Sequence, residues 1–327
     1  MHQIIQQLAG QKSVVIYAGA GVSIDRTGVS WRELVNRLLE DHVPDRDTRR
    51  TIMETYTPLE AASIACQMYS DMHGDAWMRK VVNKLRTLLY SEKTWQRGNL
   101  VTTIVELAAV FAERGISVQI VTTNYDSFLE GELQILNLAR VGKAKQEIFF
   151  ESVLVHHGKG PHTDPESEKL KYLRPTEVIL HLHGYVPEDN SGEAPVILSE
   201  VDTIDSQTLS SAILSDLFQH NAVIMVGASL SDPPLLSALA RSIRTADEKA
   251  RKQRLRVAIL PLQGIDFSRV LHGDAEQEKR AIEDYERRAK IRMKQFDVTA
   301  TFPDFYSQVP QLLREVQVCL DNCLNGP

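Results

Sequence analysis

The sequence predicts an α/β protein built on a doubly wound parallel sheet, with a helical subdomain inserted into it. Short, continuous runs rich in valine and isoleucine recur along the 327-residue chain, and stretches of helical periodicity separate most of them. Runs of this kind are typical of strands that are buried on both faces, as in a parallel sheet covered by helices. One long interval between two such runs carries only helical patterns, which predicts the insertion.

Six runs are expected to form the strands of the sheet. Each is apolar and too short to be a helix of ordinary length, which favours a buried strand. In chain order the expected strands are Ser13–Ala18, Val118–Thr122, Val178–Leu182, Ala222–Val226, Arg256–Leu260 and Phe296–Thr301.

Helix starts between these strands are indicated by capping patterns. Ser30–Glu33 (SWRE) and Thr57–Glu60 (TPLE) both read as capping boxes, and the second has proline at the first helical position. Asp232-Pro233 opens another helix, and the residues from about Val309 onward repeat apolar side chains at helical spacing.

The long helical interval divides the chain into parts. We expect residues 1–39 and 116–327 to form the α/β core, and residues 40–115 to form the inserted helical subdomain, because this interval is too long for a simple crossover. Residues 131–175 contain the polar segment GKGPHTDPESEK and are expected to be a variable, exposed loop excursion within the core.

The charge of the chain does not favour a nucleic-acid binder. The 37 Lys+Arg and 43 Asp+Glu residues give a formal net charge of −6, which gives no general reason to expect a nucleic-acid binder. The basic run Arg241–Arg256 also contains acidic residues, so it is interpreted as a solvated surface in preference to a nucleic-acid contact.

The cysteine count and the apolar runs indicate whether the chain can hold a zinc site, which compartment it occupies and whether it spans a membrane. Cys66, Cys319 and Cys323 cannot supply a four-thiolate zinc site, and so sparse a set fits a reducing cytoplasm. The first residues lack the long apolar region of a signal peptide, and no run approaches the roughly 20 residues of a membrane span. We therefore expect a soluble, cytoplasmic protein with no membrane contact and no metal.

A glycine-rich turn, AGAGVS at residues 18–23, follows the first expected strand. Glycines here let backbone amides approach a phosphate at a helix start, which is where a Rossmann-like fold holds a pyrophosphate; the alternative is a tight turn alone. The third glycine of the dinucleotide fingerprint is replaced by Ile24, which disfavours a standard dehydrogenase. The chain has no G-x-x-x-x-G-K-[ST] motif, which excludes a P-loop NTPase.

Two polar segments end the next strands. TTNYD at residues 122–126 places Asn124 and Asp126 at an edge where open α/β sheets bind ligands, although both residues are also common helix caps. In HLHG, at residues 181–184, strand alternation directs His181 and His183 to the same face. A histidine at such an edge can act as a general base, or it can be a satisfied core residue.

A fourth segment, VGASLSD at residues 226–232, ends another strand and leads into a capped helix. Ser229 in this segment can bond a ribose or a phosphate, or it can belong to an ordinary helix start.

Taken in order, GAGVS, TTNYD, HLHG and VGASLSD resemble the signature motifs of the sirtuin family, which are G-A-G-x-S, T-x-N-x-D, H-G and G-[TA]-S-L. The resemblance covers roughly residues 10–40 and 115–325. Sirtuins bind NAD and cleave the bond between nicotinamide and ribose, so the resemblance implies NAD as a substrate.

The resemblance also implies a role for each matching residue. Asn124 and His183 would be catalytic, with His183 as the base that acts on ribose hydroxyls or water. An asparagine can orient water through its amide, and a histidine accepts protons near neutral pH. The residues implied to hold NAD are Gly19, Ala20, Gly21, Ser23, Asp126, Gly227 and Ser229.

Departures from the family pattern favour water over acetyl-lysine as the acceptor. Protein-deacylating sirtuins carry a four-cysteine zinc module, whereas this chain has three cysteines, and its residues near 131–175 are few and polar. GVSWR at residues 28–32 replaces the family's G-I-P-D-F-R-like segment. The tryptophan of this segment and the helical insertion resemble the sirtuin-like NAD-hydrolysing effectors of bacterial antiphage defence. That resemblance implies hydrolysis of NAD to ADP-ribose and nicotinamide and depletion of cellular NAD.

Two other functions stay open at this point. One is NAD-dependent protein deacylation or ADP-ribosyl transfer, and the other is a non-catalytic module that binds NAD or ADP-ribose. No sensor domain is evident in the sequence, so we expect a homo-oligomer or a partner defence protein such as a ring-forming ATPase.

Overall fold

The computed structural model describes most of the chain. The described residues are 7–8, 10–91, 98–143, 147–155, 169–173, 177–189, 196–228, 232–244, 255–260, 275–301, 303 and 308–324.

Seven strands form one sheet in which every strand runs parallel to its neighbours, in the order β3-β4-β2-β1-β5-β6-β7. The strands are β1 Ser13–Ala18, β2 Ser117–Thr122, β3 Glu151–Leu154, β4 Val178–His181, β5 Ala222–Val226, β6 Arg256–Ile259 and β7 Thr299–Thr301. All six expected strands are present, and the α/β class is confirmed. After β1 the chain adds β2, then the edge strand β3, and then β4 between these two, before it returns to place β5 on the other side of β1. The strand order therefore reverses between β1 and β5, which is where folds of this type bind ligands.

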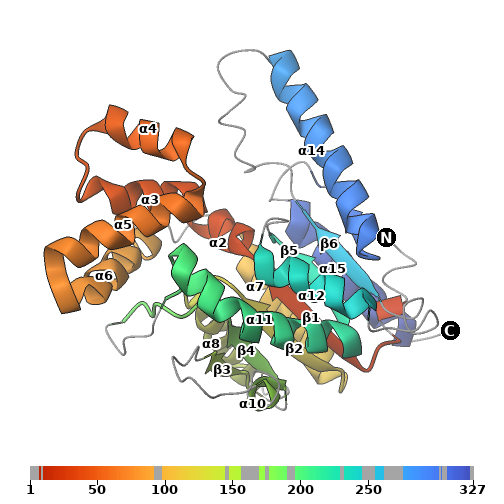
Figure 1. The fold of residues 1–327 in the computed structure, drawn as a ribbon. Helices are drawn as coiled ribbons and strands as arrows, with labels where there is room; N and C mark the ends of the chain where they lie inside the picture. The colour runs from red at the N-terminus through yellow and green to blue at the C-terminus, as the bar shows by residue number, and fades with distance from the viewer. Residues whose placement is uncertain are drawn as a thin grey trace.

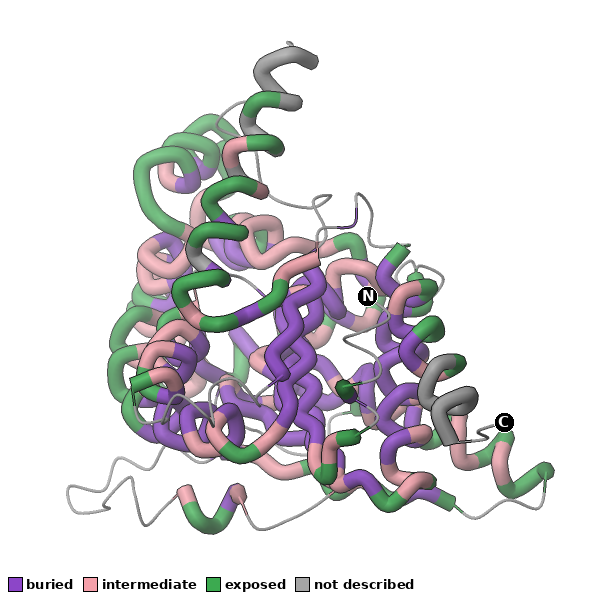
Figure 2. Tube along the Cα trace, turned by 90° about the vertical axis from the view of Figure 1, so that its right-hand side faces the viewer, coloured by how far each residue is buried: buried purple, intermediate pink, exposed green. Residues whose placement is uncertain are grey.

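Helices cover both faces of the sheet, which makes it doubly wound (Figure 1). The helices on one face are α7 Leu100–Glu113, α8 Phe128–Val141 and α15 Val309–Leu324. The helices on the other face are α10 Leu170–Leu173, α11 Glu200–His220, α12 Pro233–Arg244 and α14 Ala275–Gln295. Alternation along β1 serves both layers, since Val14 and Ile16 pack into the first and Val15 and Tyr17 into the second. Figure 2 shows the resulting buried centre.

A separate helical unit stands beside the sheet in Figure 1 and has its own apolar core. Its elements are α3 Trp31–Glu40, α4 Arg46–Thr55, α5 Pro58–His73, the short 3-10 helix η1 Gly74–Ala76 and α6 Trp77–Leu89. The short helix α2, Ala20–Thr27, links β1 to this unit. The capping pattern at Thr57 forms a full capping box, and at Ser30 the side chain accepts from the Glu33 amide.

The extent of this helical unit differs from the expected residues 40–115. It begins earlier, because Leu38 and Leu39 of α3 pack into its core. It also ends earlier, because Leu107 and Phe111 of α7 pack against the sheet. Both segments are helical and apolar, so periodicity alone could not show which core each one joins.

The structure also differs from the exposed loop expected at residues 131–175. Helix α8 continues to Val141, and Glu151–Leu154 form the edge strand β3, which pairs with β4. This strand escaped the sequence analysis because Glu151 and Ser152 are exposed and break the apolar pattern. Most of the polar segment GKGPHTDPESEK lies outside the described residues.

No helix within the described ranges combines the length and the apolar character that crossing a bilayer requires.

Candidate active site at the carboxyl ends of the central strands

The glycine turn lies at the carboxyl end of β1, beside the point where the strand order reverses. Gly19 precedes the first residue of α2 and its backbone is extended. The amides of Gly19 and Gly21 donate to the carbonyl oxygens of Val226 and Gly227, at 2.9 Å each. These two amides therefore join the ends of β1 and β5, while Ala20, between them, is exposed.

Glycine is required at this junction because the two loops nearly touch. A Cβ atom on Gly19 would lie 2.5 Å from the Cα of Ala228 and 2.5 Å from the oxygen of Gly227. Gly227 has φ of +61°, and a Cβ there would lie 2.8 Å from the amide nitrogen of Val22. Both neighbours are backbone atoms, so a side chain at either position would force the loops apart.

Asn124 ties the end of β2 to the same turn. Its Nδ2 donates to the carbonyl oxygen of Gly19 at 3.0 Å, and its own amide donates to Oγ1 of Thr122 at 3.0 Å. Thr122 in turn donates from Oγ1 to the carbonyl oxygen of Ala18 at 2.9 Å. The side chain is 7% exposed, so its amide is held in one orientation.

Asp126 both caps a helix and meets the glycine turn. Its Oδ1 accepts from the amide of Phe128 at 3.2 Å, at the start of α8, and its Oδ2 accepts from the hydroxyl of Ser23 in α2. Burial raises the pKa of the Asp126 carboxyl, and the hydrogen bonds from Ser23 and Phe128 oppose that rise. Asp126 therefore caps α8, and its hydrogen bond with Ser23 places it beside the glycine turn, while its role in holding NAD stays a prediction.

His181 ends β4 and is fully buried. Its Nε2 lies 2.7 Å from Oε1 of Glu130 in α8, its Nδ1 lies 3.3 Å from the carbonyl oxygen of Asn124, and the ring of Tyr185 packs edge-on against it. Both ring nitrogens of His181 therefore face acceptor groups of the protein itself, which disfavours His181 as a general base acting on a substrate.

His183 lies beyond the end of the strand and is half-buried. Its carbonyl oxygen accepts from the amide of Ile197 at 2.9 Å. The expectation that His181 and His183 share a face assumed an unbroken strand, but β4 ends at His181, and Gly184 turns the chain with φ of +96°. Alternation therefore does not apply beyond His181, and the catalytic role of His183 stays a prediction.

Apart from His183, described above, the sequence-predicted residues separate into three groups. Hydrogen bonds and close approach bring together Gly19, Gly21, Ser23, Asn124, Asp126 and Gly227. Ala20 lies in the same turn. Ser229 lies outside the described residues, with Leu230 and Ser231.

Sequence reasoning missed a partly buried pair at the end of β1. The hydroxyl of Tyr17, in β1, donates to Oδ2 of Asp232 at the start of α12, at 2.6 Å. Burial raises the pKa of Asp232 to about 6, and burial with the nearby carboxylate raises the pKa of Tyr17 well above its usual value. The only signal in the sequence was a tyrosine within an otherwise apolar strand.

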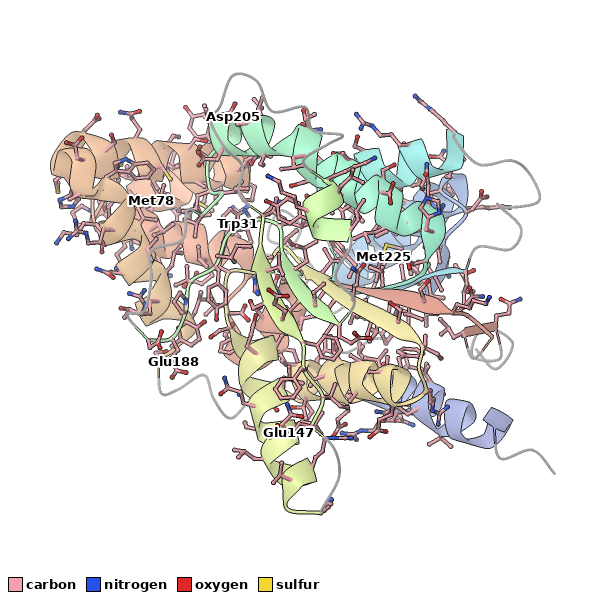
Figure 3. All side chains as sticks on the ribbon, turned by 90° about the horizontal axis from the view of Figure 1, so that it is seen from below. Trp31, Met78, Glu147, Glu188, Asp205 and Met225 are labelled. Atoms are coloured by element: carbon pink, nitrogen blue, oxygen red, sulfur yellow. The ribbon has the colours of Figure 1, made fainter. Side chains whose placement is uncertain are left out.

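The helical unit reaches the site through aromatic residues. The ring of Trp31 lies 6.2 Å from that of Tyr125, which follows Asn124, and Figure 3 shows Trp31 between the helical unit and the ends of the strands. Tyr125 donates from its hydroxyl to the carbonyl oxygen of Ile197 at 2.6 Å. Tyr90, after α6, donates to the carbonyl oxygen of Val186 at 2.7 Å. The unit thus contacts the loops that follow β2 and β4.

Within the part of the chain that the structure describes, no three His, Cys, Asp or Glu side chains gather as a metal site would require.

A family model described as a SIR2-like domain matches residues 118–293. A search among curated proteins finds no match. The matched range runs from β2 to α14 and includes Asn124, Asp126, His183 and Gly227. The glycine turn precedes it, so the evidence for that turn is its geometry.

Proposed function

The chain belongs to the SIR2-like domain family, and on that premise we propose that it hydrolyses NAD⁺ to ADP-ribose and nicotinamide. Family membership supports an NAD-dependent enzyme. The observation that carries the proposal is the hydrogen bond from Asn124 to Gly19, because it joins the proposed catalytic amide to the proposed phosphate turn. Both lie where the strand order reverses.

We place the dinucleotide along this edge of the sheet. The pyrophosphate would lie at the exposed side of the turn, by Ala20, at the positive end of the α2 helix dipole. Gly227 and Ser229 would hold the ribose or a phosphate. Asn124 and Asp126 would border the nicotinamide.

The proposed chemistry is displacement of nicotinamide by water. The C–N bond breaks with its electron pair moving to the pyridinium ring, which leaves as neutral nicotinamide. The ribose carbon develops oxocarbenium character and accepts the oxygen of water, while His183 removes a proton from that water. Nδ2 of Asn124 is engaged by Gly19, so Oδ1 is the atom that would orient the water.

Water is favoured over a modified lysine because of the cysteine count. Three cysteines cannot form the zinc module of the deacylating sirtuins. Deacylation or ADP-ribosyl transfer is the second candidate, and a non-catalytic NAD or ADP-ribose module is the third. In the cell, the proposed activity would deplete NAD in the cytoplasm during antiphage defence, through self-assembly or with a partner such as a ring-forming ATPase.

The deciding experiment incubates the protein with NAD⁺, with and without an acetylated peptide, and separates the products by chromatography. The assay spans protein concentrations across any assembly detected by light scattering. Formation of ADP-ribose and nicotinamide without peptide supports hydrolysis. Peptide-dependent formation of O-acetyl-ADP-ribose contradicts it, and NAD binding without any product at every concentration favours the binding module.

Two variants test the assigned residues. Asn124→Ala and His183→Ala are each expected to lower turnover by about 100-fold or more, because each removes a group that acts in the reaction. The matched controls are Asn83→Ala and His220→Ala, which change exposed residues on α6 and α11 and should keep full activity. Circular dichroism checks that all four fold, and full activity in both site variants would refute the assignment.

A further inference from the structure

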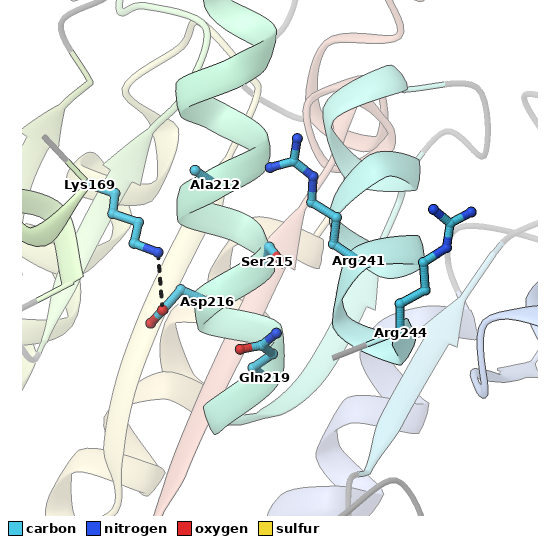
Figure 4. Close-up of a pocket in the computed structure, with 7 residues that line it drawn as sticks. All are labelled: Lys169, Ala212, Ser215, Asp216, Gln219, Arg241 and Arg244. Atoms are coloured by element: carbon cyan, nitrogen blue, oxygen red, sulfur yellow. Dashed lines mark ion pairs between the residues drawn. The ribbon is translucent and has the colours of Figure 1, made fainter. Parts of the chain in front are cut away.

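Polar side chains that the proposed function does not use gather at a surface hollow and beside the candidate active site. The hollow has a volume of about 340 Å³ and lies on the outer surface of α11 and α12. Lys169 there pairs with Asp216 at 3.6 Å (Figure 4), and Arg241 also has a partner, so neither cation is free to hold a ligand. The contact of Glu130 with His181, at the end of β4, is the one that reaches the candidate active site.

A chain of three groups runs from α8 to the peptide of Asn124. Oε1 of Glu130 lies 2.7 Å from Nε2 of His181, and Nδ1 of that ring lies 3.3 Å from the carbonyl oxygen of Asn124. A carboxylate oxygen only accepts hydrogen bonds, so Nε2 is the donor to Glu130. The ring is fully buried, and the ring of Tyr185 packs edge-on against it with centroids 4.8 Å apart. Glu130 and Tyr185 therefore hold the His181 ring against the Asn124 peptide.

The contact with His181 completes the restraint on Asn124. The amide nitrogen of Asn124 donates to Oγ1 of Thr122, and its Nδ2 donates to the carbonyl oxygen of Gly19, at 3.0 Å each. The His181 ring meets the third polar group of the same residue, its carbonyl oxygen. Because the carbonyl group and the side chain are attached to one Cα atom, rotation of the peptide would disturb the bond to Gly19. Fixing the carbonyl group thus helps to fix the amide that would orient water.

Stability alone does not account for the carboxylate of Glu130. Its Oε1 also accepts from the hydroxyl of Ser152 at 2.9 Å, whereas its Oε2 is buried and has no hydrogen-bond partner among the described residues. A buried acceptor without a partner costs free energy, and an apolar pair of similar volume is often as stable as a buried polar pair. The arrangement therefore favours orientation of His181, over stability of the fold, as the contribution of Glu130.

We propose that Glu130 is a positioning residue for the reaction of NAD, and that it acts through His181 to hold Asn124 in the orientation that directs water. This inference rests on the proposed function, since it adds a residue to that reaction. Glu130 acts through Asn124 and not on the dinucleotide. Its loss should therefore lower the rate of the chemical step and leave the affinity for NAD unchanged.

Steady-state kinetics of NAD hydrolysis by Glu130→Leu tests the proposal. The variant should lower kcat at least about tenfold with KM within about twofold of the parent, while its thermal midpoint stays the same or rises. Glu130→Gln keeps an acceptor for Nε2 of His181 and should recover most of the lost kcat. The control Glu113→Leu breaks an ion pair with Arg140, near the other end of α8, and should keep the parent kcat.

A double-mutant cycle tests whether Glu130 acts through Asn124. In an Asn124→Ala background, Glu130→Leu should lower kcat by less than about twofold further, because the group that it positions is already absent. The double variant Glu130→Leu/His181→Phe removes both polar partners together, and it should lose the same kcat as Glu130→Leu alone. This variant replaces Glu130→Leu in the kinetic test if the single variant does not fold.

The NMR signal of the Asn124 side-chain amide gives a readout that needs no turnover. This signal, identified by its loss in Asn124→Ala, should shift or broaden in Glu130→Leu and stay at the parent position in Glu113→Leu. Parent kcat in folded Glu130→Leu, additive losses in the Asn124→Ala background, or an unchanged Asn124 signal would overturn the proposal. A parent protein that does not hydrolyse NAD contradicts the proposed function instead, and the Asn124 signal then still decides whether Glu130 positions that side chain.

Discussion

At the scale of single residues, the hydroxyl of Tyr17 near the end of β1 donates to the carboxylate of Asp232 at the start of α12. Burial raises the pKa of Asp232 from its ordinary 3.8 to about 6. The folded protein therefore holds this proton more tightly than the unfolded chain does. The stabilisation from the protonated carboxyl is full below about pH 4 and is lost as the pH rises through about 6.

Asp232→Asn should remove this pH dependence, because asparagine keeps an acceptor for Tyr17 and still caps α12. Relative to the variant, the parent should lose on the order of 3 kcal/mol of unfolding free energy between about pH 4 and pH 7. Urea unfolding at several pH values measures the difference. Asp205→Asn, at an exposed position of α11, is the control, and parallel profiles for the parent and Asp232→Asn would contradict the assignment.

His181 and His183 show that residue type alone does not decide which histidine of a motif is the candidate base. The motif HLHG offered two histidines for one catalytic role. The contacts of His181 with Glu130 and Asn124 make it a structural partner of the Asn124 peptide, which leaves His183 as the candidate base. No local pattern revealed this, because Glu130 belongs to a helix 51 residues away in sequence from His181.

At the scale of elements, the glycine turn and the loop after β5 approach each other closely through backbone atoms at Gly19 and Gly227. Gly19→Ala should therefore destabilise the fold by about 1–3 kcal/mol, because the new methyl group has only backbone to displace. Gly19→Ala should also weaken NAD binding, because it displaces the proposed phosphate turn. Thermal unfolding and calorimetric titration measure the two effects.

Gly131→Ala is the matched control for this change. Gly131 lies inside α8, and a Cβ there would meet no atom within 4 Å. Alanine favours helix, so this variant should be as stable as the parent or more stable by up to about 1 kcal/mol. Equal effects of the two substitutions would mean that the loops do not require glycine.

The strands were predictable where every residue is buried, because their sequences are then continuously apolar. Val14–Tyr17 and Ala222–Val226 are buried throughout, and continuous apolar runs marked them. The edge strand β3 is partly exposed and carries polar residues, so its sequence resembles a loop. At β7 the ordered strand is shorter than the expected Phe296–Thr301, because Phe296 and Asp297 form a turn.

At the scale of the whole molecule, the helical unit and the sheet meet around Tyr90. Its hydroxyl donates to the carbonyl oxygen of Val186 at 2.7 Å and accepts from the amide of Ser127 at 2.7 Å. One side chain thus links the end of α6 to the loops after β2 and β4. Its burial also raises the pKa of the Tyr90 hydroxyl, so it stays protonated and able to donate.

Tyr90→Phe should loosen this junction and lower the unfolding free energy by about 1–3 kcal/mol, because two partly buried backbone groups, the Val186 carbonyl and the Ser127 amide, lose their partner. If the helical unit helps to shape the site, the KM for NAD should rise more than kcat falls. Tyr56→Phe, at a half-exposed position before α5, should change stability by less than about 0.5 kcal/mol. A Tyr90→Phe protein with parent stability and parent KM would show that the junction does not depend on this hydroxyl.

The motifs predicted which strand ends carry the site, but not how those ends are joined. Parallel strands place their carboxyl ends at one edge, so the grouping of Gly19, Asn124 and Gly227 followed from the fold class. The contacts between them, and the Tyr17–Asp232 pair, join residues more than 100 positions apart. Pairings at that separation depend on the final packing of whole layers, which local periodicity does not encode.

The hydrogen bonds from the glycine turn to the end of β5 also set an order of events during synthesis. Gly19 and Asn124 leave the ribosome well before Val226 and Gly227, and parallel pairing across such separations forms late in folding. A nascent chain that stops short of β5 therefore lacks one wall of the edge where NAD would bind. On the proposed function, a truncated product would leave the NAD of its cell intact. The activity would begin only after β5 has paired with β1.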